Sequence, residues 1–237
     1  NLVRVFFLQN RLKEQGKKRE SGIEEVHVIG AGTMGGDIAA WCALRGLRVT
    51  LQDREQKYVE PAMQRATKLF NKRIRNTNLR AEASDRLVPD IAGDGARQAD
   101  LIIEAIFENT EAKHAVYRDI RDRMKQDTIL ASNTSSIRIE ELRTASKQPG
   151  RFVGLHFFNP VAKLPLVEVI RCDDTEESAL DRVFAFVRSI GKLPLECRSS
   201  PGFVVNRVLA PYMAEAICLV TEGVPIPTID ATAEEFG

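Results

Sequence analysis

The sequence predicts an α/β protein built on a largely parallel sheet. Two observations lead to this prediction. From Ile23 onward, short apolar runs alternate with segments of helical periodicity, a pattern typical of parallel strands joined by crossover helices. In addition, the first apolar run ends in a glycine-rich turn at residues 30–35, as happens where a strand of such a sheet leads into a helix.

Each expected strand is a short apolar run, and each expected helix repeats its apolar residues every three to four positions. In chain order, strands are expected at residues 25–29, 48–52, 88–92, 101–105, 128–131, 152–157, 166–172 and 193–197. Helices are expected at residues 33–45, 57–76, 110–124, 175–189 and 202–222. Gly46 ends the first of these helices, and Pro201 follows two serines at the start of the last one.

The composition excludes several classes of protein. The 237 residues include 34 Lys and Arg against 33 Asp and Glu, a balance that does not suit a nucleic-acid-binding surface. Charged residues make up 28% of the chain, as in ordered globular proteins. The cysteines form no CxxC pair and are expected to be free thiols in a reducing compartment; they are Cys42, Cys172, Cys197 and Cys218. With only three histidines, no His/Cys metal site is expected.

The first 22 residues are expected to form a separate unit, because an apolar stretch is followed by charged residues and a Ser21-Gly22 break. We interpret residues 1–22 as a linker helix after a preceding domain; a membrane-surface helix is the alternative, which the acidic residues oppose. The most apolar long stretch, 203–220, is interrupted by polar residues, so no transmembrane segment is expected. The chain opens with Asn1 and has no signal peptide, so we expect a piece of a longer protein.

The turn after the first expected strand has the spacing GxGxxG, with Thr33 and Met34 between its second and third glycines. Gly30 permits the tight turn, Gly32 lets the backbone approach a pyrophosphate, and Gly35 lets the helix pack closely on the strand. The N–H groups at the start of that helix are then available to phosphates. A chance glycine turn is the alternative, but the strand–turn–helix context favours dinucleotide binding.

Asp53 ends the second expected strand, where an acidic residue completes the dinucleotide pattern. Its carboxylate can accept hydrogen bonds from ribose hydroxyls and would repel a 2′-phosphate, so the sequence favours NAD over NADP. The adjacent Arg54 could reduce this preference. A simple turn residue after a strand is the alternative interpretation of Asp53.

A candidate acid–base pair lies further along the chain. His156 ends an apolar strand just before an Asn-Pro turn, at the strand edge where α/β proteins bind ligands. Glu168 lies inside the next apolar strand, where a carboxylate needs a partner. If the strands are neighbours, Glu168 can fix the tautomer of His156 and stabilise its protonated form, as the general base of an alcohol oxidation requires. A structural ion pair, or a solvent-facing Glu168 on an edge strand, is the alternative.

Two polar sites could complete this pocket. The run 132–136, which follows the fifth expected strand, could bind a substrate oxygen or a ribose; the alternative is a helix cap made by Ser136 with Glu140 in the first turn. Asn206 lies in the early turns of the last expected helix, where an amide among apolar residues needs a partner.

Taken together, five segments resemble the L-3-hydroxyacyl-CoA dehydrogenases of fatty-acid β-oxidation. They are GAGTMG, SNTSS, HFFNPV, LVEVI and SPGFVVNR, in this order between Ile23 and the end of the chain. The resemblance implies a Rossmann-type doubly wound, mostly parallel sheet at residues 23–200. It implies the incomplete start of an α-helical substrate and dimerisation domain at residues 201–237. The opening NLVRVFFLQNRLKEQGKK resembles the connector behind the enoyl-CoA hydratase part of multifunctional β-oxidation proteins.

The resemblance also implies a role for individual residues. His156 would be the general base for the 3-hydroxyl group, and Glu168 would orient it and balance its charge. Ser135 and Asn206 would hydrogen-bond the reacting oxygen or the bound cofactor and substrate. NAD would be held by Gly30, Gly32, Thr33, Met34, Gly35 and Asp53, with Glu108, Lys113, Asn133, Ser135 and Asn159 toward its nicotinamide end.

The expected activity is therefore NAD-dependent oxidation of an L-3-hydroxyacyl-CoA, with the preceding hydratase domain and a thiolase subunit as further partners. The expected compartment is the bacterial cytoplasm, with an organelle matrix as the alternative. Because the helical domain would be incomplete, we expect NAD binding with poor turnover. A stand-alone 3-hydroxybutyryl-CoA dehydrogenase is a second candidate, which the connector opposes. A non-catalytic NAD-binding protein is a third, which the retained pair of His156 and Glu168 opposes, because an imperfect buried pair costs stability.

Overall fold

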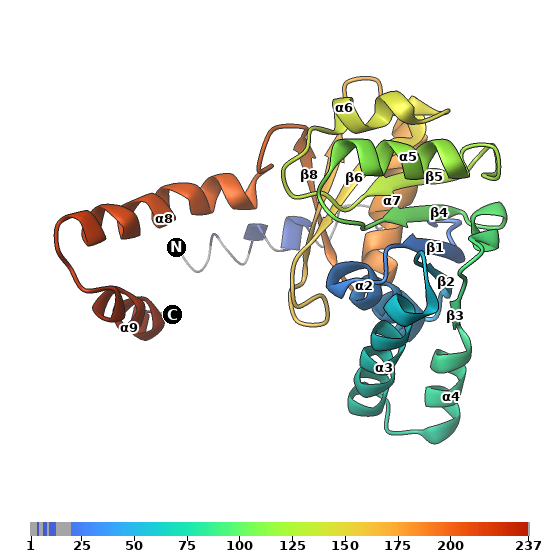
Figure 1. Cartoon of the computed structure of the whole chain (residues 1–237), viewed down its shortest axis with the longest axis horizontal. Helices are drawn as coiled ribbons and strands as arrows, with labels where there is room; N and C mark the ends of the chain where they lie inside the picture. Colours follow the sequence, from blue (N-terminus) through green and yellow to red (C-terminus); the bar gives the residue numbers. More distant parts are fainter. Residues whose placement is uncertain (1–3, 5–6, 9, 13–19, 237) are drawn as a thin grey trace.

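The computed structural model describes residues 4, 7–8, 10–12 and 20–236, and within them an eight-stranded sheet forms the centre of the protein (Figure 1). In chain order the strands are β1 (Glu25–Ile29), β2 (Arg48–Gln52), β3 (Leu87–Pro89), β4 (Leu101–Glu104), β5 (Ile129–Ser132), β6 (Phe152–Phe157), β7 (Leu166–Arg171) and β8 (Leu193–Arg198). Their order in the sheet is β3-β2-β1-β4-β5-β6-β7-β8. All neighbours are parallel except β6 and β7, which are antiparallel. The predicted doubly wound, mostly parallel sheet is confirmed.

Helices cover both faces of this sheet. The α-helices are α2 (Thr33–Leu44), α3 (Gln56–Arg73), α4 (Thr77–Asp85), α5 (Thr110–Ile120), α6 (Ile139–Leu142), α7 (Glu177–Ser189), α8 (Val205–Thr221) and α9 (Ile226–Phe236). Short 3-10 turns lie at Asp94–Arg97, Arg143–Ala145 and Pro149–Arg151. One apolar core joins the sheet to α2, α3 and α7, and a second joins the opposite face to α5 and α6.

The central strand β4 shows why both faces are buried. Leu101 and Ile103 belong to the first core, whereas Ile102 between them belongs to the second. Side chains alternate between the faces of a strand, so a continuous apolar run is what a doubly covered strand requires. This arrangement brings the carboxyl ends of β1, β4, β5 and β6 to one edge of the sheet.

Several helix boundaries differ from those predicted. The helix expected at 57–76 ends at Arg73, and a separate α4 follows because the Asn76 side chain accepts the N–H groups of Asn78 and Leu79 as a new cap. The helix expected at 110–124 ends at Ile120. The helix expected at 202–222 begins only at Val205, since the backbone before it has left-handed φ angles of 74° at Gly202 and 46° at Phe203.

Helical residues lie near both ends of the chain. Of the predicted linker helix at 1–22, residues 4, 7–8 and 10–12 are helical, and most of the remainder lies outside the described residues. At the other end, α8 extends away from the sheet and leads to α9, which the sequence did not predict as a helix (Figure 1). Within the described ranges, no helix is long and apolar enough to cross a membrane.

Candidate functional site

The glycine-rich turn between β1 and α2 adopts the conformation that its glycines allow. Gly30 has a φ of 104°, and a Cβ atom there would lie 2.7 Å from the carbonyl oxygen of Ala105, in the loop after β4. A Cβ at Gly35 would lie 1.8 Å from the carbonyl oxygen of Gly30, so α2 can approach β1 only because this residue is glycine. A Cβ at Gly32 would meet nothing within 4 Å. Gly30 and Gly35 are therefore needed by the fold itself, whereas the space above Gly32 is open.

A pocket of about 790 Å³ opens at this turn. It is lined by the turn, by the end of β2, by α3 and by α5, and its lining includes Gly32, Thr33, Asp53, Ile106 and Val116. Its volume is within the range of about 300–1,000 Å³ that is usual for small-molecule sites. Gly32 is the N-cap of α2 and has no side chain to cap the helix, which leaves first-turn N–H groups for an anion. These features fit the phosphates and adenosine of a dinucleotide.

Asp53 follows β2 directly and joins this strand to the glycine-rich turn. Its Oδ2 accepts a hydrogen bond from the N–H of Ala31 at 2.7 Å, and its Oδ1 accepts one from the N–H of Arg54 at 2.7 Å. Each carboxylate oxygen keeps a further lone pair for a ribose hydroxyl. The guanidinium of Arg54 lies over the ring of Tyr58, 5.6 Å from its centre. Asp53 thus shapes the turn and remains able to accept hydrogen bonds from a ligand in the pocket.

His156 and Glu168 are paired across the antiparallel strands β6 and β7. They are direct partners in the register of the two strands, and Nδ1 of His156 lies 2.7 Å from Oε2 of Glu168. Glu168 is fully buried and His156 is almost so, with 7% of its surface exposed. The expectation that the two residues meet is confirmed by this geometry. The alternative of a solvent-facing Glu168 on an edge strand is wrong, because β8 covers the other side of β7.

The second oxygen of Glu168 is bound to the start of α8. Oε1 accepts the N–H groups of Val204 at 2.8 Å and Val205 at 2.9 Å. Burial alone would raise the pKa of Glu168, but the hydrogen bonds from His156 and from these two N–H groups outweigh it and hold the pKa below its ordinary value. Glu168 therefore stays ionised beside His156, and Nε2 of His156 remains for a substrate. The ring of Phe158 flanks this imidazole at 4.5 Å.

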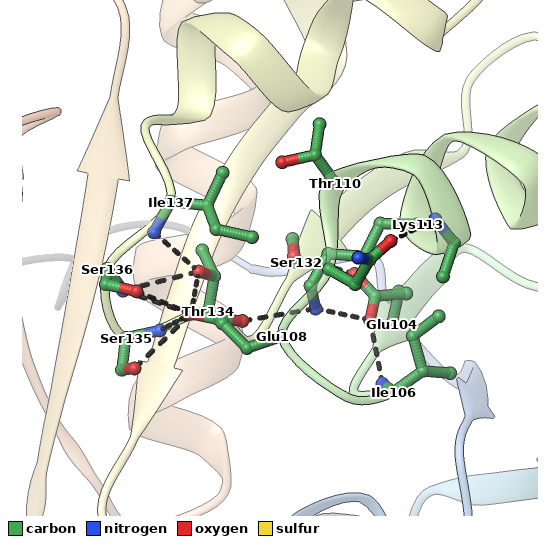
Figure 2. A network of polar contacts seen from close by, with 12 residues as sticks. Glu104, Ile106, Glu108, Thr110, Lys113, Ser132, Thr134, Ser135, Ser136 and Ile137 are labelled. Atoms are coloured by element: carbon green, nitrogen blue, oxygen red, sulfur yellow. Dashed lines mark hydrogen bonds and ion pairs between the residues drawn. The ribbon is translucent and has the colours of Figure 1, made fainter.

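The polar turn after β5 is organised by Glu108 (Figure 2). Oε1 of Glu108 accepts hydrogen bonds from the hydroxyl of Thr134 at 2.6 Å and from the N–H groups of Ser135 at 2.9 Å and Ser136 at 3.1 Å. The hypothesis that Ser136 caps a helix is wrong. The helix α6 begins at Ile139, and both the N–H and the hydroxyl of Ser136 bind Glu108 instead.

Glu104 is a member of this network that sequence reasoning did not single out. It is the last residue of β4, is fully buried, and accepts four hydrogen bonds. Figure 2 shows Glu104 together with Ile106, Lys113 and Ser132. The donors are the Lys113 ammonium, the Ile106 N–H, and the hydroxyls of Tyr117 and Ser132, each at 2.7 Å. An acidic residue at the end of an otherwise apolar strand, with a lysine in the following helix, was the signal that could have indicated it.

The remaining predicted site residues lie at or near the same edge of the sheet. Asn133 accepts the N–H of Phe157 at 3.0 Å through its Oδ1, which links the ends of β5 and β6. Asn159 is exposed and forms a cis peptide bond with Pro160. Asn206 is exposed in the first turn of α8, and the partner expected for its amide stays a prediction. Met34 is half-buried on α2.

The doubly wound sheet, the glycine-rich turn and the pocket define the dinucleotide-binding class of α/β domains. The family model described as "3-hydroxyacyl-CoA dehydrogenase, NAD binding domain" matches residues 25–200, and the one described as "3-hydroxyacyl-CoA dehydrogenase, C-terminal domain" matches residues 202–237. The chain belongs to the 3-hydroxyacyl-CoA dehydrogenase family, and it carries the family's NAD-binding domain.

Similar proteins of known name agree with this. The fatty acid oxidation complex subunit alpha of Pseudomonas entomophila (strain L48) is 37% identical over 244 residues, which include 100% of this chain and 34% of the relative. The chain thus spans about a third of the length of the curated relatives it matches. The crystal structure of (S)-3-hydroxybutyryl-CoA dehydrogenase PaaH1 from Ralstonia eutropha is 36% identical, with a TM-score of 0.81 over 86% of this chain and 74% of that chain. FadB2 of M. tuberculosis is similar, at 35% identity and a TM-score of 0.81 over 86% of this chain and 73% of that chain.

Proposed function

We propose that this protein oxidises an L-3-hydroxyacyl-CoA to the 3-ketoacyl-CoA with NAD as the oxidant. The observation that carries the proposal is the buried pair of His156 and Glu168, at 2.7 Å, in a chain that also has the glycine-rich turn and the nucleotide-sized pocket. An alcohol oxidation needs both a base for the hydroxyl proton and a hydride acceptor. The pair suits the first requirement and the family's cofactor suits the second.

The proton steps follow from the geometry of the pair. Because Nδ1 of His156 is bound to Glu168, Nε2 is the atom that takes the proton from the 3-hydroxyl group. The ionised Glu168 stabilises the imidazolium that results, and its own bonds to α8 fix its orientation. NAD, when bound, supplies the acceptor for the hydride that leaves the carbon bearing the 3-hydroxyl group. Ser135 and Asn206 are proposed to hydrogen-bond the reacting oxygen.

The proposed cofactor contacts follow the pocket and the edge of the sheet beside it. Gly30, Gly32 and Thr33, which line the pocket, take the pyrophosphate together with Met34 and Gly35 of the same turn, and Asp53, which also lines the pocket, takes the adenosine ribose. Glu108, Lys113, Asn133, Ser135 and Asn159 belong to the nicotinamide end. The supporting observation is that Glu108 forms an ion pair with Lys113 and accepts a hydrogen bond from the N–H of Ser135.

The domain organisation and the partners are proposals as well. Residues 1–22 act as a linker, residues 23–200 as the NAD-binding domain, and residues 201–237 as the start of the helical substrate domain. Because relatives are named fatty acid oxidation complex subunit alpha, we propose an enoyl-CoA hydratase part in the same chain, a thiolase subunit as partner, and the bacterial cytoplasm as location. The alternative is a stand-alone 3-hydroxybutyryl-CoA dehydrogenase, supported by the names of two similar structures.

The test measures NADH oxidation by the protein with a short 3-ketoacyl-CoA, in the reverse direction. His156→Gln should lower turnover by about 100-fold or more and leave NADH binding intact, because only the base is lost. His114→Gln is the matched control: His114 is another largely buried histidine, bound to the carbonyl of Glu141 at 3.0 Å, and its loss should not affect turnover. Equal turnover in parent and His156→Gln would contradict the assigned base. Comparison of short and long acyl chains separates the two candidate substrates.

A further inference from the structure

The side chain of Arg65 on α3 reaches the glycine-rich turn at the start of α2, the helix against which α3 packs (Figure 1). Its Nη2 donates a hydrogen bond to the carbonyl oxygen of Gly32 at 2.8 Å, and its Nε donates one to Oδ1 of Asp37 at 3.1 Å. Arg65, Gly32 and Thr33 also line the same pocket. The guanidinium therefore lies directly beside the residue at which the pyrophosphate is proposed to bind.

The surface of α2 leaves room for this side chain at Gly36. A Cβ atom at Gly36 would lie 2.7 Å from Nη2 of Arg65 and 2.7 Å from the Cβ of Ala62, which is three residues earlier on α3. A side chain at this position would therefore have to displace the helix, the guanidinium or both. The glycine that directly follows the GxGxxG turn thus provides the space in which Arg65 reaches Gly32.

The position of this positive charge is unfavourable for the protein alone. Gly32 is the N-cap of α2, and the N–H groups at the start of a helix carry a partial positive charge that repels a cation. The ion pair between Arg65 and Asp37 offsets this repulsion, but the two side chains are 38% and 29% exposed, so water screens the pair. An anion at Gly32 would be attracted by the helix start and by the guanidinium together.

Arg65 keeps donors for such an anion. A guanidinium has five N–H groups, and the hydrogen bonds of Arg65 to the described residues use Nε and one N–H of Nη2. Within that part of the chain, Nη1 and the second N–H of Nη2 are left, and two N–H groups of a guanidinium can bind one phosphate. The pocket lining includes two further cations, Arg54 and Lys57, but both lie against the ring of Tyr58.

We propose that Arg65 is a further cofactor-binding residue, whose guanidinium donates hydrogen bonds to the pyrophosphate of NAD at Gly32. This inference rests on the proposed function, because it takes the pyrophosphate to lie at the glycine-rich turn. It goes beyond that proposal by adding a charged contact from α3 to a phosphate site that is otherwise made of N–H groups of α2. Asp37 is then a positioning residue, which holds the guanidinium against α2 and does not touch the cofactor.

The test compares the binding of NADH, ADP-ribose and adenosine, with NADH followed by its fluorescence and the other two by displacement of NADH. Arg65→Met should weaken the binding of NADH and of ADP-ribose by about tenfold, the usual effect of losing one charge-assisted hydrogen bond. It should weaken the binding of adenosine by less than about twofold, because adenosine carries no phosphate. An equal loss for all three ligands would mean that Arg65 only shapes the pocket, and would overturn the proposal.

Asp37 allows a direct contact to be separated from neutralisation of a nearby acid. If Arg65 only neutralised Asp37, its loss would expose a carboxylate that repels the pyrophosphate, and Arg65→Met would have no effect in an Asp37→Asn background. A direct contact predicts that the loss of about tenfold persists in that background, because an asparagine can still accept the N–H of Arg65. Arg65→Lys, which keeps the charge without the two-pronged geometry, should recover part of the affinity.

Ionic strength gives a second readout. The affinity of the parent for ADP-ribose should fall more steeply between about 0.05 and 0.5 M salt than that of Arg65→Met, since a partly exposed charge is screened by salt. Parallel salt dependences in the two proteins would mean that the ligand does not experience the charge of Arg65, and would contradict the proposal.

Arg73→Met is the matched control. Arg73 also lies on α3 and donates to a carbonyl oxygen, that of Ala162 at 2.9 Å, but it does not line the pocket, so its loss should leave the affinity for NADH unchanged. If Arg65→Met has a lower unfolding temperature without ligand, Arg65→Gln replaces it, because a glutamine keeps a donor for Gly32 and removes the charge. If the parent protein fails to bind NADH, the proposed function fails. If the parent binds and Arg65→Met has no effect, only the present inference fails.

Discussion

The carboxylate of Glu168 accepts a hydrogen bond from the N–H of Val205 at 2.9 Å, so the residue that orients His156 is also bound to the first residue of α8. The proposed base and the helix that leads out of the sheet domain are therefore connected through a single buried side chain. Loss of its charge affects both at once, which gives the first prediction.

Glu168→Gln is expected to lower turnover and stability together. A glutamine keeps one acceptor but presents an N–H₂ group either to His156 or to the N–H groups that start α8. Loss of a charged acceptor at a fully buried position costs about 2 kcal/mol. Thermal unfolding and turnover should be measured on the same samples. A variant with parental unfolding temperature would contradict the role of Glu168 in holding α8.

The effect of Glu168 on stability should depend on pH in a defined direction. The pKa of Glu168 in the folded protein lies below its ordinary value of 4.5, so its contribution is fully present above about pH 4.5 and is lost as the pH falls through the folded pKa. The difference in unfolding free energy between parent and Glu168→Gln should therefore shrink below that pH. A difference that stays constant down to about pH 3 would argue against an ionised Glu168.

Two alanine substitutions in the glycine-rich turn should separate the stability of the fold from the binding of NADH. Gly30→Ala forces a side chain into a left-handed φ and against the carbonyl of Ala105, so it should destabilise the fold by about 1–3 kcal/mol. Gly32→Ala meets no atom of the protein within 4 Å and should leave the unfolding temperature nearly unchanged. Gly32→Ala should nevertheless weaken NADH binding, since the methyl group occupies the space that the pyrophosphate needs. Tight NADH binding by Gly32→Ala would place the pyrophosphate elsewhere.

Asp53→Asn should reduce discrimination between NADH and NADPH. The carboxylate repels a 2′-phosphate, whereas an amide of the same size can still accept the N–H of Ala31. The dissociation constant of NADPH divided by that of NADH, both measured by fluorescence, is expected to fall toward one. Arg54→Gln is the companion variant: if Arg54 attracts the 2′-phosphate, its loss should weaken NADPH binding and raise this ratio. An unchanged ratio in Asp53→Asn would remove Asp53 from cofactor selection.

The single tryptophan should report the ionisation of a buried lysine. Nζ of Lys192 lies 4.3 Å from the centre of the Trp41 ring and donates to the carbonyl oxygens of Val161 and Leu164. Burial, together with the charges of Arg45 and Arg73, lowers the pKa of Lys192 to about 8. Trp41 fluorescence should therefore titrate with a midpoint near that value, and the titration should disappear in Lys192→Met.

The sign of the accompanying stability change follows from the same pKa. The folded protein loses the Lys192 proton near pH 8, while the unfolded chain keeps it to about pH 10.5, so stability from this group should rise between these values. Chemical unfolding of the parent and of Lys192→Met at about pH 7.5 and pH 10 measures this change in unfolding free energy. A fall in the parent relative to the variant over this interval would contradict the lowered pKa.

The order of the strands along the chain and the pairing of His156 with Glu168 could be predicted because each follows from a local pattern. Apolar runs predict the strands, glycine spacing predicts the turn, and a carboxylate inside an apolar strand demands a partner. What could not be predicted depends on contacts between distant segments. The start of α8 has no capping side chain of its own, because Glu168, which is 37 residues before Val205, accepts its N–H groups.

Glu104 and Ser136 are two further residues whose environment could not be predicted from the local sequence. Glu104 stands at the end of a strand, where an acidic residue is equally compatible with solvent, and only the folded structure brings Lys113, Tyr117 and Ser132 to it. Ser136 has the local pattern of a helix cap, but its N–H and hydroxyl groups bind Glu108, which lies in the loop between β4 and α5. In both cases a tertiary hydrogen bond decides between two locally reasonable structures.

The antiparallel pairing of β6 and β7 limits how the sequence can change. Side chains alternate along a strand, so inserting or deleting one residue inside either strand would rotate His156 or Glu168 to the opposite face of the sheet. Substitutions at neighbouring positions can be absorbed by repacking, whereas a change of strand length by one residue separates the pair. Sequence drift within these two strands is therefore expected to proceed by replacement of residues, with changes of length confined to the connection between them at residues 158–165.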